Sequence, residues 1–209
     1  MALIMIIAPL FAFAETPQRN RATLLFVPFT VQAPWGNWSE PWQEFCEEAS
    51  VVMAAHFLWR TPLTPSLANQ EMRIIQQYEN AVFGRYQDTS AAETARILRE
   101  LYGFKQIFVR PVGGAKDIKQ ELFAGHIVIV PAAGRMLKNP YFKGLGPKYH
   151  MLVIVGYDDT RGGFIAHDPG TRRGQNFAYP QTRLIDAIHD WNDGNGEEGD
   201  RAMIVVARE

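Results

Sequence analysis

The hydrophobic pattern of this chain changes near its midpoint, and the change restricts the folds that the chain can adopt. Apolar residues at helical spacing predict helices over 44–59, 65–78 and 90–102. Short apolar runs bounded by Gly and Pro predict strands, mostly in the second half, with further helices at 115–123 and after Pro180. The predicted strands are 24–31, 106–112, 126–130, 149–157, 164–167 and 202–206. Helices followed by mainly antiparallel strands indicate an α+β architecture rather than an alternating parallel one.

Length and composition indicate one domain with a sizeable core. The chain has 209 residues, of which 47% are hydrophobic, and we expect residues 15–209 to form a single domain. Lys plus Arg number 21 and Asp plus Glu number 22, which gives a formal net charge of -1. This balance lacks the basic surface of a nucleic-acid-binding protein, so no nucleic-acid partner is expected.

The first 14 residues have the outline of a secretory signal peptide. They carry no charge, and Ala12 and Ala14 stand at the -3 and -1 positions of a cleavage site before Glu15. We therefore expect export to the periplasm, the cell surface or the medium. The run is too short to cross a bilayer, so no stable membrane span is expected after its removal. No basic residue precedes the run and Pro9 interrupts it, which leaves a packed apolar N-terminus and a cytoplasmic protein as the alternative.

The chain has one cysteine, Cys46, in the first turn of the predicted helix 44–59. Free N–H groups and the helix dipole at this end favour a thiolate, which is the nucleophilic form of cysteine. Glu47 and Glu48 add negative charge beside it and oppose ionisation. The alternative interpretation is a buried structural cysteine that acts as a small hydrophobic residue.

Two later residues fit the other roles that thiol catalysis requires. His150 begins a predicted strand, and Asp168 follows the end of the next strand, before Pro169. Adjacent antiparallel strands lie side by side, so Asp168 can reach the His150 ring and orient it. The order of cysteine, histidine and acid along the chain is that of papain-like enzymes.

Three segments of this chain resemble the peptidase C39-like family, the papain-like peptidases of the double-glycine leader-peptidase type. The first segment is similar to the family's "VP-x-x-x-Q" strand and Cys-bearing helix. It matches at Val27, Pro28, Gln32, Cys46, Glu47, Ala49, Ser50 and Met53. The segments 125–159 and 166–174 resemble the family's His-bearing strand and its acid-bearing "DP" segment. The resemblance covers about residues 24–180, and its Cys-Glu sequence replaces the Cys-Gly of the leader peptidases.

The resemblance implies a papain-like fold, in which the Cys-bearing helix packs on an antiparallel sheet that carries His150 and Asp168. It also implies a glutamine upstream of the cysteine as an oxyanion donor. Gln32 matches the family motif, whereas Gln43 lies closer to Cys46 in sequence, and both stay candidates.

Three tryptophans, Trp35, Trp38 and Trp42, lie in the loop before Cys46. They either line a cleft for a peptide or glycan or pin this loop to the core. No metal site is expected, because one Cys and five scattered His show no ligand spacing, and no cofactor motif is present.

The sequence thus predicts a thiol hydrolase, a cysteine peptidase that cleaves a peptide or amide bond through a thioester. An amidase or transferase that acts on peptidoglycan would need the same nucleophile, base and orienting acid. The alternative is an exported, non-catalytic module that binds a peptide or cell-wall fragment, which the Cys-Glu-Glu sequence favours. A peptide-like partner is expected in either case.

Overall fold

The structure is a computed structural model and describes residues 21–194 and 196–208. Its strands are β1 (Ala22–Leu24), β2 (Ile107–Pro111), β3 (Ile127–Ala133), β4 (Tyr149–Asp158), β5 (Gly163–His167), β6 (Phe177–Pro180) and β7 (Ala202–Val206). Its helices are α1 (Cys46–Trp59), α2 (Pro65–Val82), α3 (Ala91–Glu100), α4 (Ala115–Phe123), α5 (Gly134–Leu137) and α6 (Gln181–Ala187), and a 3-10 turn, η1 (Trp42–Glu44), precedes α1. The predicted α+β class is confirmed.

All strand pairs of the described residues are antiparallel, and they follow the order β2-β7-β3-β4-β5-β6. The long strand β4 is central. It pairs with β3 along its first part and with β5 along its second part, while β1 pairs with its last residues. The chain therefore places the beginning of β4 beside the end of β5.

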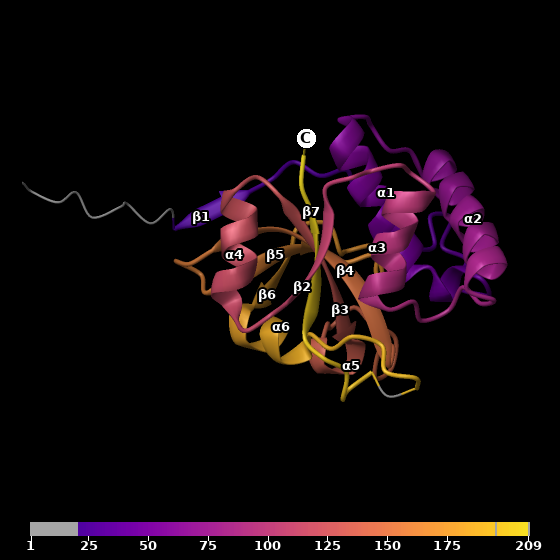
Figure 1. Cartoon of the computed structure of the whole chain (residues 1–209). Helices are drawn as coiled ribbons and strands as arrows, with labels where there is room; N and C mark the ends of the chain where they lie inside the picture. The colour runs from indigo at the N-terminus through magenta and orange to yellow at the C-terminus, as the bar shows by residue number, and fades with distance from the viewer. Residues whose placement is uncertain (1–20, 195, 209) are drawn as a thin grey trace, which may run out of the picture.

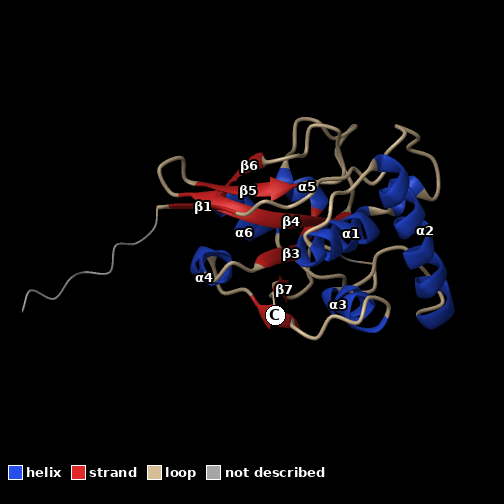
Figure 2. Ribbon diagram, turned by 90° about the horizontal axis from the view of Figure 1, so that it is seen from above, coloured by secondary structure: helices blue, strands red, loops and turns tan. Residues whose placement is uncertain are grey.

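Helices cover both faces of the sheet (Figure 1, Figure 2). α1, α2 and α3 lie on one face, and α4 and α6 lie on the other. The alternation of side chains along β4 supplies both layers, because Met151 and Val153 belong to the core under α1 whereas Leu152 and Ile154 belong to the core under α4 and α6. The protein thus has two apolar cores that share one sheet.

Helix α1 is enclosed by its neighbours. It packs against β4, α2 and α3, and twelve of its fourteen residues are buried. The sequence pattern predicted a helix with one apolar face, but the few charged residues of this segment allow burial all round. As a consequence Glu47 and Glu48, in its first turn, are buried as well.

Some predicted boundaries are wrong. The strand predicted over 24–31 is paired only over Ala22–Leu24, and the chain then runs on without strand pairing past Pro28, which has no N–H to donate. Strand β3 continues through Pro131 to Ala133, because beyond Ile129 its pairing with β4 goes on after the pairing with β7 has ended, and Ala132 also forms an isolated bridge with Ile188. The predicted loop at 131–147 therefore begins later and contains α5.

The predicted signal segment, 1–14, lies outside the described residues. Over the residues that the structure describes, no helix has the length and apolarity needed to cross a membrane.

Candidate active site

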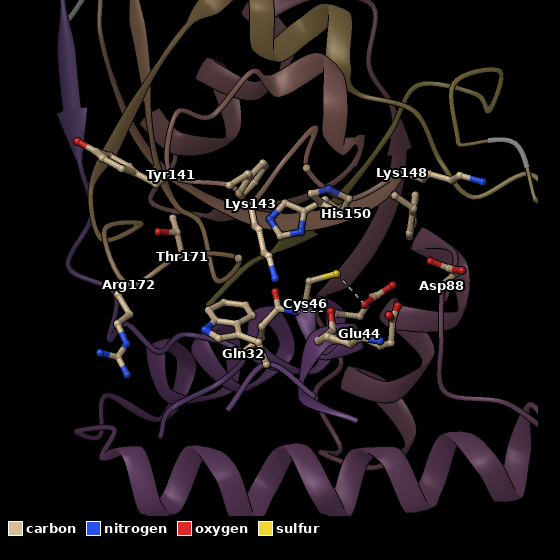
Figure 3. Close-up of a pocket in the computed structure, with 18 of the residues that line it drawn as sticks. Gln32, Glu44, Cys46, Asp88, Tyr141, Lys143, Lys148, His150, Thr171 and Arg172 are labelled. Atoms are coloured by element: carbon tan, nitrogen blue, oxygen red, sulfur yellow. Dashed lines mark hydrogen bonds between the residues drawn. The ribbon is translucent and has the colours of Figure 1, made fainter. Parts of the chain in front are cut away.

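A cavity of about 900 Å³ opens where the first turn of α1 meets the beginning of β4. Its lining comes from some of the residues within 32–47 and 141–150, from Asp88 and from residues 170–173. The predicted catalytic residues Cys46 and His150 both lie in its wall (Figure 3). The fold thus brings together a helix terminus and a strand terminus that are about 100 positions apart in the chain.

His150 and Asp168 form a buried pair. The His150 Nε2 lies 2.8 Å from Asp168 Oδ1, and the two side chains are 1% and 0% exposed. The register of β4 and β5 explains the contact, since Val153 pairs with His167 and Asp168 follows directly. The contact that the sequence predicted between these residues is present.

Asp168 is held by three further groups. Its Oδ2 accepts hydrogen bonds from Asn139 Nδ2, at 2.9 Å, and from the Tyr179 hydroxyl, and its Oδ1 accepts one from the Gly170 N–H at 2.9 Å. Burial alone would raise the pKa of Asp168, but the His150 ring and these hydrogen bonds outweigh it and lower the pKa. Sequence reasoning missed Asn139 and Tyr179, because they lie in a long loop and in a strand that was not predicted.

The His150 ring is fixed by close packing. A Cβ atom added at Gly170 would lie 2.9 Å from His150 Cε1, and one at Gly134 would lie 3.1 Å from His150 Cβ. Phe142 packs edge-on against the ring at 5.3 Å between centroids. Since Nε2 is bonded to Asp168, Nδ1 is the nitrogen left to exchange a proton with a thiol.

The Cys46 thiol is hydrogen-bonded to the carboxyl group of Glu47. Its Sγ lies 3.0 Å from Glu47 Oε2, and no hydrogen bond joins Cys46 to His150 in the described part of the chain. Burial raises the pKa of Cys46 well above its ordinary value, and Glu47 and Glu48 raise it further, although a hydrogen bond from the Met151 backbone opposes them. The helix terminus that was expected to favour the thiolate is therefore outweighed in this arrangement.

The buried acids extend from Glu47 to a carboxyl pair behind it. Burial raises the pKa of Glu47 to about 8. Burial, and to a smaller extent the charge of Glu47, raises the pKa of Glu79 to about 9. Burial and Glu79 raise the pKa of Glu48 well above its ordinary value. In the described part of the chain no other side chain forms a geometrically good hydrogen bond to the Glu48 or Glu79 carboxyl, so burial favours the protonated, neutral form of both.

The two candidate oxyanion donors lie in the cavity wall but differ in their surroundings. Gln32 is buried, and its Nε2 donates to the backbone carbonyls of Trp42 at 3.1 Å and Gln43 at 2.7 Å. Both N–H bonds of the amide are thus used, and its Oε1 has no hydrogen-bond partner among the described residues. Gln43 is exposed, and its amide donates to Glu40 at 2.6 Å. The backbone N–H of Cys46, the first residue of α1, has no acceptor within the helix.

Of the three tryptophans, one lies in the wall of the cavity and one pins the loop to the core. Trp38 lines the cavity, whereas Trp42 packs against the core and donates its Nε1–H to Asn69 at 2.8 Å. Trp35 is 62% exposed and is not part of the cavity wall.

Among the residues that the structure describes, no three His, Cys, Asp or Glu side chains are placed to hold a metal ion.

Comparisons with known proteins agree with this arrangement. Residues 24–195 match the sequence profile of the Peptidase C39-like family. The chain is similar in structure to a candidate C39-like peptidase from Bacillus anthracis, with a TM-score of 0.59 and 14% sequence identity over 91% of this chain and 100% of that one. No curated protein matches the sequence. The profile match spans most of the chain, which therefore belongs to the peptidase C39-like family and has an α+β, papain-like fold.

Proposed function

We propose that this protein is a cysteine peptidase that hydrolyses a peptide or amide bond, with Cys46 as nucleophile, His150 as base and Asp168 as the residue that orients the base. The observation that carries the proposal is the buried pair of His150 and Asp168, of which His150 lines the same cavity as Cys46, the only cysteine of the chain. An acid that fixes a histidine beside a thiol is the arrangement that nucleophilic catalysis requires.

The reaction would proceed by acyl transfer. The Cys46 thiol gives its proton to His150 Nδ1, and the sulfur forms a bond to the carbonyl carbon of the substrate. The carbon–nitrogen bond then breaks as His150 returns the proton to the leaving amine. Water, deprotonated by His150, attacks the thioester, and the thiol is restored when the acid product leaves.

One side-chain movement would prepare the site for this reaction. The Cys46 sulfur must leave Glu47 and turn toward His150, which a change of rotamer about the Cα–Cβ bond provides. The backbone N–H of Cys46 is then a donor for the oxyanion. Gln32 could add a second donor only if its amide turned over, and this would place its oxygen against two carbonyl oxygens.

A non-catalytic binding module is the second candidate function. The bond between Cys46 and Glu47 and the raised pKa of Cys46 favour it, because a thiol that stays protonated is a poor nucleophile. In this case the cavity would hold a peptide or a cell-wall fragment without cleaving it.

Hydrolysis of a mixed pool of internally quenched peptides distinguishes the two functions. We expect the wild-type protein to cleave the pool, and Cys46→Ala and His150→Ala each to lower the rate at least about a hundredfold. His126→Ala is the control, because His126 is paired with Glu121 outside the cavity wall. Full activity in the Cys46→Ala protein would contradict the proposed peptidase activity. Absence of hydrolysis in the wild type and in all variants would favour the binding module.

A further inference from the structure

Charged side chains divide the wall of the cavity into two sides (Figure 3). Lys143 and Arg172 lie on one side of Cys46, whereas Glu44 and Asp88 lie on the other. Arg173 joins the first group, with its guanidinium 4.9 Å from the centre of the Tyr141 ring. A ligand in this cavity therefore meets positive charge at one end and negative charge at the other.

The cations on the first side have no acidic partner in the described part of the chain. Lys143, Arg172 and Arg173 take part in none of its ion pairs, and all three are exposed at the rim. Figure 3 shows the Lys143 side chain extending toward Gln32 and Cys46. The Arg172 side chain is directed away from Cys46 in Figure 3 and packs over Gly36, so it lies at the rim rather than inside the cavity. Unpaired cations at the rim of a cavity attract an anionic group of the ligand.

The acids on the second side reinforce this division. Glu44 and Asp88 are in no ion pair of the described residues. Burial raises the pKa of both carboxyls, and for Glu44 the charges of Glu40 and Asp88 add to this effect. Lys148 lies on the same side, but its side chain is directed away from Cys46 in Figure 3. An anionic ligand group is thus disfavoured here, and a cation is favoured.

A buried acceptor between the two sides indicates that the ligand has N–H groups. Gln32 is 4% exposed and lines the cavity, and no group in the described part of the chain donates to its Oε1. A buried carbonyl oxygen without a donor is unfavourable unless a ligand supplies one. The amide N–H of a peptide backbone is a donor of the right kind.

We propose that the cavity selects an extended peptide with a carboxylate on the Arg172 side and a cationic or neutral group on the Glu44 side. The carboxylate is that of an Asp or Glu side chain or of a chain terminus, and it contacts Lys143 and Arg172. The inference rests on the proposed function in that it assigns this charge order to the substrate of the same site.

Binding of two peptides of the same composition and opposite charge order tests the inference. Both peptides have capped ends. From the N-terminus, one has three glutamates, two glycines and three lysines, and the other has three lysines, two glycines and three glutamates. The full-length Cys46→Ala protein is titrated with each peptide by calorimetry, so that no turnover takes place. We expect one order to bind at least about fivefold more tightly, and the preference to weaken as salt is added.

A charge-reversed variant locates the preference. Lys143→Glu with Arg172→Glu, in the Cys46→Ala protein, is expected to abolish or invert the preference. Lys105→Glu with Arg161→Glu is the matched control, because these cations are exposed outside the cavity wall and the change in net charge is the same. Equal affinity for the two orders, absence of binding, or a preference that survives the first double variant would overturn the inference. The hydrolysis assay decides the proposed function separately, because the preference is measured without catalysis.

Discussion

The sulfur of Cys46 lies 3.0 Å from Oε2 of Glu47, the next residue in the chain, in a contact that is buried in the first turn of α1. The thiol donates to this carboxylate when Glu47 is ionised. Burial raises the pKa of Glu47 to about 8, so the carboxyl loses its proton in the same pH range in which a cysteine ordinarily does. Glu47 therefore adds to the effect of burial in opposing the Cys46 thiolate as the pH rises.

Replacing Glu47 by Gln is expected to make Cys46 more reactive in alkaline solution. Above about pH 8 the wild-type carboxylate opposes a second negative charge on the sulfur, whereas the amide of Glu47→Gln never ionises. The rate of iodoacetamide alkylation at pH 9 should rise about tenfold, and the difference should narrow toward pH 7. The measurement is the alkylation rate of both proteins between pH 6 and 10.

Glu48→Gln is a control for this experiment in which a smaller effect is expected. Glu48 has a smaller effect on the pKa of Cys46 than Glu47 and makes no hydrogen bond to the sulfur. Its substitution should therefore change the alkylation rate less. Identical profiles for wild type and Glu47→Gln would show that this contact does not govern the thiol.

The buried carboxyls predict that the folded state loses stability as the pH rises. The pKa values of Glu47 and Glu79 in the folded protein are about 8 and about 9, while a glutamate in the unfolded chain ionises near pH 4.3. The folded state thus binds more protons than the unfolded state between these limits, and its stability declines from about pH 4.5 to pH 9. Chemical denaturation at pH 5, 7 and 9 measures this decline.

Glu79→Gln should reduce the decline, because the amide stays neutral and can donate to Glu48. We expect the free energy of unfolding at pH 8 to rise by about 2 kcal/mol, with little change at pH 5. Glu198→Gln, at an exposed position, should leave the profile as it is. A stability that stays level between pH 5 and pH 9 in the wild type would contradict this account.

Asp168→Asn is expected to impair catalysis without weakening substrate binding. The asparagine can no longer stabilise a protonated His150, so kcat should fall about a thousandfold while KM stays close to its wild-type value. Tyr179→Phe removes one hydrogen bond to Asp168 and should have a smaller effect, about tenfold on kcat. Steady-state kinetics with one quenched peptide give both constants.

Asp186→Asn is the matched control for this pair, because Asp186 is exposed in α6 and is paired with Arg201. It should show wild-type kinetics. If Asp168→Asn raised KM and left kcat unchanged, Asp168 would serve substrate binding and the orienting role would be wrong.

Elements with a strong local pattern were predictable from the sequence. The helix predicted over 115–123 is α4, Ala115–Phe123, in which Ile118 and Leu122 give the apolar spacing of one turn. The strand predicted over 202–206 is β7, all of whose residues are buried. In these segments the local preference and the tertiary packing favour the same structure.

Features that depend on tertiary contacts were not predictable. Strand β6 has only four residues, ends in a proline and shows no apolar alternation. Tyr179 in this strand and Asn139 in the long loop reach Asp168 only because the sheet and the loop converge on it. Likewise, the bond of the Cys46 sulfur to Glu47 follows from the enclosure of α1, which the helical spacing did not reveal.

The tryptophans before Cys46 are expected to have separable roles. Trp38 is 40% exposed in the cavity wall, so Trp38→Ala should weaken peptide binding several-fold with no change in stability. Trp42→Phe should instead lower the free energy of unfolding by about 1 kcal/mol, because it leaves Asn69 Oδ1 without its donor. Calorimetry and chemical denaturation of each variant measure the two quantities. Trp35→Ala is the control and should change neither. Equal loss of stability in the Trp38 and Trp42 variants would mean that both residues pin the loop and that the aromatic wall does not bind the ligand.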